Sequence, residues 1–311
     1  MKQVELMLCA ALLAGATAMA QQPAQGGAAA QQGQPTQQQG AQAHPGAQAQ
    51  PGTPAQPQGK TPPQAKTQEE FTAYQEAAGK QTPEEAEAAA DAFAAKFKDS
   101  EIRTVLYHRV MQLYQNANNA DKAIETGRKI LAINPNDPIA NVMVATFISE
   151  RTRDTDLDKA ERVAEAQKDA KKALETVDTD FVYPPGTPPE RVEGAKAMVK
   201  SMAYTALGQT EAVNENYAGA EKYFQQAVTV PNAQADAITW LQYALVLDKA
   251  KKYQDALVKA NQAYNLAPAG SSVQNLVKQE RDRLLKLTGA APAATPAAAA
   301  PAPQTTPPPK Q

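Results

Sequence analysis

The stretch 253–269, YQDALVKANQAYNLAPA, has small residues at helical spacing where a core would usually hold larger ones. Ala256, Ala260 and Ala263 recur at intervals of four and three residues, which places them on one face of a helix. Pro268 ends the run, because proline lacks an amide hydrogen and clashes with the preceding turn. A helix that buries alanine rather than leucine is expected to pack closely against another helix.

Two segments of the chain that contain this pattern match each other over their full length. YHRVMQLYQNANNADKAIETGRKILAINPND begins at Tyr107, and WLQYALVLDKAKKYQDALVKANQAYNLAPAG begins at Trp240. Each segment reads as a helix, a short polar turn, a second helix and a proline. Helix start signals also occur at Thr67 and Thr82, whereas the alternation typical of strands is nearly absent. The sequence therefore predicts an all-α fold made of helix pairs.

These segments resemble the tetratricopeptide repeat, in which aromatic, large apolar and small residues hold fixed places before a closing proline. In the last repeat the pattern falls on Trp240, Tyr243, Ala244, Leu247, Ala256, Ala260 and Pro268. In the earlier one it falls on Tyr107, Val110, Met111, Tyr114, Ala123, Gly127 and Pro135. Met111 departs from the pattern, because it replaces the small residue of the first helix.

Two further sets match less well. One is Asn141, Val144, Ala145, Ile148, Ala160 and Ala164, without a closing proline. The other is Ala197, Lys200, Ser201, Tyr204, Ala220, Phe224, Ala227 and Pro231, with extra residues between the two helices. The resemblance implies a right-handed α-solenoid over residues 67–288, with repeats at about 104–137, 138–176, 194–231 and 237–270. An ordinary helical bundle is the alternative.

Two sequence features adjoin these repeats. Prolines in 180–196, DFVYPPGTPPERVEGAK, rule out a continuous helix there, so we expect a loop over the solenoid or a joint between two halves. Residues 271–288 place apolar side chains on one face, which is typical of a terminal capping helix. The apolar positions are Val273, Leu276, Val277, Leu284 and Leu287.

Both ends of the 311-residue chain differ in composition from its centre. Residues 1–20 have a basic start, a short apolar core and the cleavage signal Ala18-Met19-Ala20, which predicts a signal peptide. We therefore expect a periplasmic or secreted protein, cleaved after Ala20 and without a stable membrane span. Residues 21–66 are rich in Gln, Ala, Pro and Gly, residues 289–311 in Ala and Pro, and both are predicted to be disordered.

The composition also limits the possible chemistry. The single cysteine, Cys9, lies in the predicted signal peptide, so the mature chain would have neither disulfides nor thiolate metal sites. Without the four lysines and one glutamate of the end segments, 27 of 31 bases and 32 of 33 acids remain, a balance of −5. These charges are scattered at helical spacing, so no nucleic-acid-binding stripe is expected. We likewise expect no cofactor, metal or catalytic residue.

Two motifs are weighed against this interpretation. Asp154, Asp156, Asp158 and Glu165 have the spacing of a calcium-binding loop, but Lys159 replaces the glycine that its sharp turn requires. An inter-helix turn with aspartate capping is preferred. His108 stands alone without a nucleophile to serve, and we expect it to lie on the surface or in a groove.

Since no catalytic, cofactor or metal site is expected, the candidate functional feature is a binding surface. In tetratricopeptide repeats, ligands lie in the concave groove lined by the first helix of each pair. Helical phase predicts that this lining consists of His108, Arg109, Gln112, Gln115, Met143, Thr146, Met198, Met202, Thr205, Leu241, Gln242 and Leu245. The hypothesis is a non-catalytic scaffold or adaptor of the cell envelope that binds a protein or peptide there. Three alternatives stay open: a structural spacer, a helical enzyme, and a lining whose methionines are covered by neighbouring helices.

Overall fold

The structure is a computed structural model that describes residues 60–289, and over that range the chain is all-helical. Eleven α-helices make up most of this part of the chain. The β-type backbone pairing in it is an isolated bridge between Lys60 and Val182. The prediction of an all-α fold is confirmed. The predicted signal peptide lies outside the described residues. So do the two predicted disordered segments, apart from residues 60–66 and Gly289.

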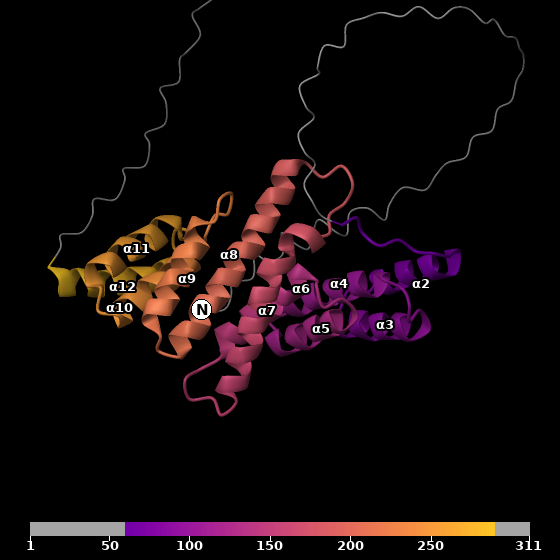
Figure 1. Ribbon diagram of the computed structural model, residues 1–311, viewed down its shortest axis with the longest axis horizontal. Coiled ribbons are helices and arrows are strands. Elements are labelled where there is room, and N and C mark those ends of the chain that lie inside the picture. Colours follow the sequence, from indigo (N-terminus) through magenta and orange to yellow (C-terminus); the bar gives the residue numbers. More distant parts are fainter. Residues whose placement is uncertain (1–59, 290–311) are drawn as a thin grey trace, which may run out of the picture. The chain divides into compact units, whose positions relative to one another are not determined.

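The described residues divide into two compact units, with the boundary between Ala235 and Asp236. Within each unit, every helix packs against the next one along the chain (Figure 1). The first unit contains α2 (Gln68–Ala78), α3 (Pro83–Lys96), α4 (Ile102–Asn116), α5 (Ala120–Ile133), α6 (Pro138–Arg151), α7 (Lys159–Asp180), α8 (Pro189–Val213) and α9 (Tyr217–Thr229). The second unit contains α10 (Ala237–Lys249), α11 (Tyr253–Leu266) and α12 (Ser272–Thr288).

Side-chain caps fix the start of most helices. The hydroxyl of Thr67 accepts from the amide of Glu70 at 3.1 Å, and that of Thr82 accepts from Glu85 at 3.3 Å. Both helix starts were expected from the sequence. Asn119 and Asn216 cap α5 and α9 in the same way, so these two helices begin directly after a short polar turn.

Helices of the first unit approach each other closely at two glycines. A Cβ atom added to Gly127 on α5 would lie 2.4 Å from Cγ2 of Val144 on α6. A Cβ atom on Gly208 of α8 would lie 2.8 Å from the ring of Phe224 on α9. Because real Cβ atoms do not come so near, glycine is what permits these two crossings. The helix pairs therefore depend on small residues, as the spacing predicts.

One of the weaker repeat assignments was wrong in its second helix. Ala160 and Ala164 are exposed, and the buried positions of α7 are instead Val163, Ala166 and Ala170. Ala160 lies in the first turn of α7, which begins only at Lys159. The spacing of alanines gave the helix correctly but not the face that it buries.

The longest helices of the unit, α7 and α8, extend beyond the expected repeats. The expected loop at 180–196 shrinks to residues 181–188, which join the projecting ends of α7 and α8 at the top of Figure 1. These two helices pack against each other and against α6, so this loop is not a joint between halves. Lys60 is hydrogen-bonded to Phe181 and Tyr183 at 2.9 and 3.1 Å, which places residues 60–66 with the helical part rather than with the predicted disordered segment.

The second unit is organised around the stripe of alanines on α11. Ala256, Ala260 and Ala263 are fully buried, and α10 and α12 pack against this helix. On α12, Val273, Val277 and Leu284 are buried, as a capping helix requires, whereas Leu287 is 51% exposed and lies off the expected face. The cation of Arg283 pairs with Asp248 at 2.6 Å and so ties α12 to α10.

The glycine crossing predicts opposite effects for two substitutions in α8. Gly208→Ala forces a methyl group into the ring of Phe224 and is expected to destabilise the protein by about 1–3 kcal/mol. Gly194→Ala, on the same helix but with no atom within 4 Å, is expected to stabilise it by about 0.5–1 kcal/mol. Urea unfolding followed by circular dichroism measures both. Equal effects for the two variants would show that Gly208 is not at a close crossing.

Candidate binding surface

The predicted lining divides between the two units. Nine of its residues lie on α4, α6 and α8 of the first unit, and Leu241, Gln242 and Leu245 lie on α10 of the second. Two of the nine are core residues, because Met143 is 1% exposed and Gln115 is 3% exposed. The prediction that these two line an open groove was wrong. Helical phase assigns them to the right helices but cannot show that neighbouring helices cover them.

His108 is not a free surface histidine. Its Nε2 lies 2.8 Å from Oδ2 of Asp137, and its side chain is 15% exposed. Asp137 caps α6, because its Oδ1 accepts from the amide of Ala140 at 2.8 Å. Burial raises the pKa of Asp137, but His108 and the amides of Ala140 and Ile139 outweigh it and hold that pKa below its usual value. The pair links α4 to the start of α6.

The partly exposed members of the set lie on the same helices. Gln112 on α4, and Met198, Met202 and Thr205 on α8, are each half-buried. Met202 packs against the core with one side, and the hydroxyl of Thr205 donates to the carbonyl of Ser201 at 2.9 Å. Three more members of the set in the first unit, His108, Arg109 and Thr146, are also partly exposed, so a ligand could reach these seven side chains without rearrangement of the helices.

Buried polar atoms without hydrogen-bond partners are concentrated in this set. Of seven such side-chain atoms among the described residues, five belong to the predicted lining. They are Nδ1 of His108, Nε of Arg109, Oε1 of Gln115, Oγ1 of Thr146 and Oε1 of Gln242. Each such atom costs about 1–3 kcal/mol when it is left unsatisfied, so unpaired polar groups are rare away from sites of binding or strain.

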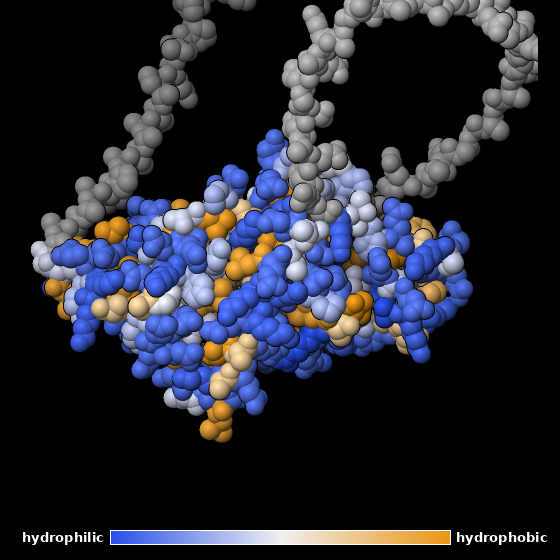
Figure 2. All heavy atoms as spheres, in the orientation of Figure 1, coloured by the Kyte–Doolittle hydropathy of each residue, from blue (hydrophilic) through white to orange (hydrophobic). Residues whose placement is uncertain are grey.

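Arg109 illustrates how these side chains are held. Its Nη2 donates to the carbonyl of Lys80 at 2.9 Å, so the guanidinium is anchored at one end while Nε remains unpaired. On α6, Oγ1 of Thr146 is likewise buried without a partner. The face of the molecule seen in Figure 2 is mostly hydrophilic, with apolar side chains in small separate patches.

On α10 of the second unit, the predicted residues lie beside an aromatic pair. Leu245 is 41% exposed, and Leu241 and Gln242 are half-buried. The rings of Trp240 and Tyr243 stack with centroids 6.5 Å apart, and Nζ of Lys259 lies 5.5 and 5.1 Å from them. This contact joins α10 to α11 and is a packing arrangement within the unit.

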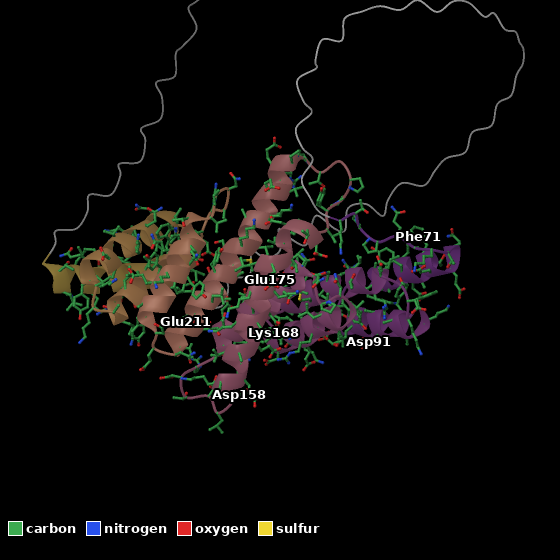
Figure 3. All side chains as sticks on the ribbon, in the orientation of Figure 1. Phe71, Asp91, Asp158, Lys168, Glu175 and Glu211 are labelled. Atoms are coloured by element: carbon green, nitrogen blue, oxygen red, sulfur yellow. The ribbon has the colours of Figure 1, made fainter. Side chains whose placement is uncertain are left out.

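The densest group of titratable residues holds α3, α4 and α5 together. The hydroxyl of Tyr114 donates to Glu87 at 2.6 Å, that of Tyr107 donates to Asp91 at 2.8 Å, and Lys129 bonds to both carboxylates. Burial and the Asp91 carboxylate raise the pKa of Tyr107 to about 12. Every group here has a partner, so the cluster is a structural tie between helices, labelled at Asp91 in Figure 3.

The aspartates of the segment with calcium-loop spacing, Asp154, Asp156 and Asp158, lie in the turn between α6 and α7, in agreement with the preferred interpretation as an inter-helix turn. Oδ2 of Asp156 accepts from the amide of Arg153 at 2.9 Å, whereas Asp158, the residue before α7, makes no side-chain capping bond, so the expected aspartate cap does not form at the start of α7. Glu165 lies on α7 and binds Arg128 through two hydrogen bonds of 2.7 and 2.6 Å. Leu157 is fully exposed on this turn. Residues 60–289 contain no group of three acidic, histidine or cysteine side chains placed to hold a metal.

Sequence reasoning missed Asp169 on α7. This residue is 5% exposed and lines a hollow between α5, α6 and α7. The signal was present, because Asp169 falls on the same helical face as the buried residues Ala166, Ala170 and Ala173. An acid in an apolar stripe is unusual, because aspartate is seldom buried unless it is paired.

Comparisons with known proteins do not assign a family. No protein-family model matches the chain, and no curated protein matches it. Within residues 60–289, none of the helices combines the length and apolar character needed to cross a membrane.

Met143 is buried and Met202 is half-buried, so the folded protein is expected to tolerate a charged substitution at Met202 better than at Met143. Met143→Glu buries a carboxylate in the core and is expected to destabilise the protein by more than about 4 kcal/mol. Met202→Glu can turn its charge toward water and is expected to cost about 1–2 kcal/mol with helicity retained. Thermal unfolding followed at 222 nm distinguishes them. If Met143→Glu unfolds like wild type, Met143 is not in the core.

Proposed function

We propose that the chain is a non-catalytic, exported adaptor that binds a protein or peptide on a surface formed by the first helices of its helix pairs. The pairs would stack as a right-handed solenoid of the tetratricopeptide type. Support for this arrangement comes from the order of packing, in which α2 contacts α4 and α6 contacts α8, so that first helices meet in two of the three successions of neighbouring pairs in the first unit. Small residues at Gly127 and Gly208 sit where such pairs cross.

The observation that carries the proposal is the set of unpaired polar atoms on α4 and α6. His108, Arg109 and Thr146, which are partly exposed, each keep one buried polar atom without a partner, whereas the titratable groups that join α3, α4 and α5 are fully paired. An extended segment or helix offers amide and carbonyl groups that can satisfy such atoms. Small shifts of the side chains around them would admit these groups.

Half-buried side chains would supply the apolar part of the contact. Met198 and Met202 lie one turn apart on α8, next to Thr205. Thioether side chains are flexible and polarizable, so they adapt to partners of different shape. The binding surface in the first unit would therefore run from Gln112 on α4 to Thr205 on α8.

Export is part of the same proposal and is supported by the sequence of residues 1–20 alone. A protein that leaves the cytoplasm by this signal would begin at Gln21. Mass spectrometry of the protein purified from its own cells is expected to give a mature N-terminus at Gln21. A chain that retains Met1 would contradict export by cleavage.

Binding is tested by crosslinking the mature protein in an extract of its own cell envelope and identifying what is captured. The Met202→Glu, Leu245→Glu variant places charges on the proposed surface of each unit and is expected to lose a partner that wild type enriches at least tenfold. The expected loss reflects burial of carboxylates against an apolar contact.

Ala132→Glu provides the matched control, because Ala132 is exposed on α5, the second helix of its pair. This control should retain the partner, and circular dichroism should show equal helicity for all three proteins. The proposal fails if wild type enriches nothing, or if the double variant captures the same proteins as wild type. Either result would favour a structural spacer instead.

A further inference from the structure

A hollow of about 380 Å³ lies between α5, α6 and α7 of the first unit. It is lined by Leu131, Pro135, Asn141, Lys168, Asp169, Lys171, Lys172 and Glu175. Two of these, Lys168 and Glu175, lie two turns apart on α7 (Figure 3). The volume is at the lower end of the range for small-molecule sites, enough for one amino-acid-sized ligand.

The base of the hollow presents hydrogen-bond acceptors. Asp169 is 5% exposed and forms no hydrogen bond or ion pair with any of residues 60–289. Asn141 is 2% exposed, and its amide nitrogen donates to the carbonyls of Pro135 and Asp137 at 3.0 and 2.8 Å. Its amide oxygen accepts nothing from the described part of the chain. A ligand that fits here must donate hydrogen bonds.

The electrostatics of Asp169 agree with a carboxylate that burial partly desolvates. Burial, together with the neighbouring Glu165, raises the pKa of Asp169 to about 6, against the opposing effect of Lys168 and Arg128. The other charged side chains around it are Lys171, Lys172 and Glu175. Lys172 pairs with Glu175 at 3.5 Å and so is partly neutralised. An ionised acid in this place is destabilising unless a cation joins it.

The outer edge of the hollow has the opposite character. Lys168 and Lys171 are exposed and form no ion pair or hydrogen bond within residues 60–289. Two ammonium groups at the entrance attract an anion, while the carboxylate beneath them attracts a donor. Leu131 and Pro135 add an apolar part to the lining.

We propose that this hollow binds a basic amino acid, free or as the carboxyl-terminal residue of a peptide. Its side-chain cation would pair with Asp169 and donate to Asn141, and its carboxylate would lie between Lys168 and Lys171. Guanidinium suits the base best, because it offers five donors in a planar fork that matches a carboxylate. A ligand that carries only a negative charge would be repelled by Asp169. A ligand that carries only a positive charge would be repelled by Lys168 and Lys171 at the entrance.

Isothermal titration of the full chain with L-arginine at pH 7.5 tests the site. Saturable binding is expected, and it should weaken about tenfold at pH 5.0, because protonation removes the charge of Asp169 from most molecules. Citrulline, which lacks the cation, and agmatine, which lacks the carboxylate, should each bind at least tenfold more weakly. No binding of arginine at pH 7.5 would overturn the proposal.

Substitutions test which residues of the hollow bind arginine. Asp169→Asn should weaken arginine binding at least tenfold and remove its dependence on pH, whereas Glu161→Gln, on an exposed part of α7, should leave both unchanged. A peptide ending in arginine, compared with its carboxyl-terminal amide, distinguishes the two sources of this chemistry. Equal binding by Asp169→Asn and wild type would overturn the assignment.

Stability provides a test that needs no ligand. The pKa of Asp169 is raised on folding, so its ionisation destabilises the folded state, fully above about pH 6 and not at all below about pH 4. Asp169→Asn should therefore raise Tm by a few degrees at pH 7.5 and leave it unchanged at pH 3.5. A lower Tm at pH 7.5 would show that the carboxylate is already paired.

Discussion

The close approach of neighbouring helices is the constraint on which the rest of the structure depends. Gly127 meets Val144 and Gly208 meets Phe224 at distances that leave no room for a Cβ atom. Alanine has the same role on α11, where Ala260 is fully buried. Because small residues occupy the crossings, the larger side chains are displaced to the sides, and each helix pair keeps an apolar face that the next pair must cover.

This way of packing separates two surfaces of the first unit. The first helices, α4, α6 and α8, hold the unpaired polar atoms and the half-buried methionines, and they form the proposed binding surface. The second helices, α5 and α7, are tied by Arg128 and Glu165, and the hollow around Asp169 lies beside this tie. Thus a large partner and a small ligand would not compete for the same residues.

The helices, their caps and most of the small buried positions could be predicted from the sequence, because these features are local and repeat along the chain. The face of α7 could not, since Ala160 and Ala164 mark a helix but only its neighbours decide which side is buried. Met143 and Gln115 were misplaced for the same reason. Asp169 was missed because a buried acid is recognised by the absence of partners, and that is a property of the folded chain.

The most direct test of the central claim is to ask which helices touch a partner. A photo-crosslinking amino acid at Gln112 on α4, compared with one at Ala132 on α5, reports contact at each surface in an envelope extract. If the first helices bind the partner, one discrete crosslinked species is expected from position 112 and none from position 132. Crosslinks from position 132 alone, or equal crosslinks from both, would contradict binding by the first helices.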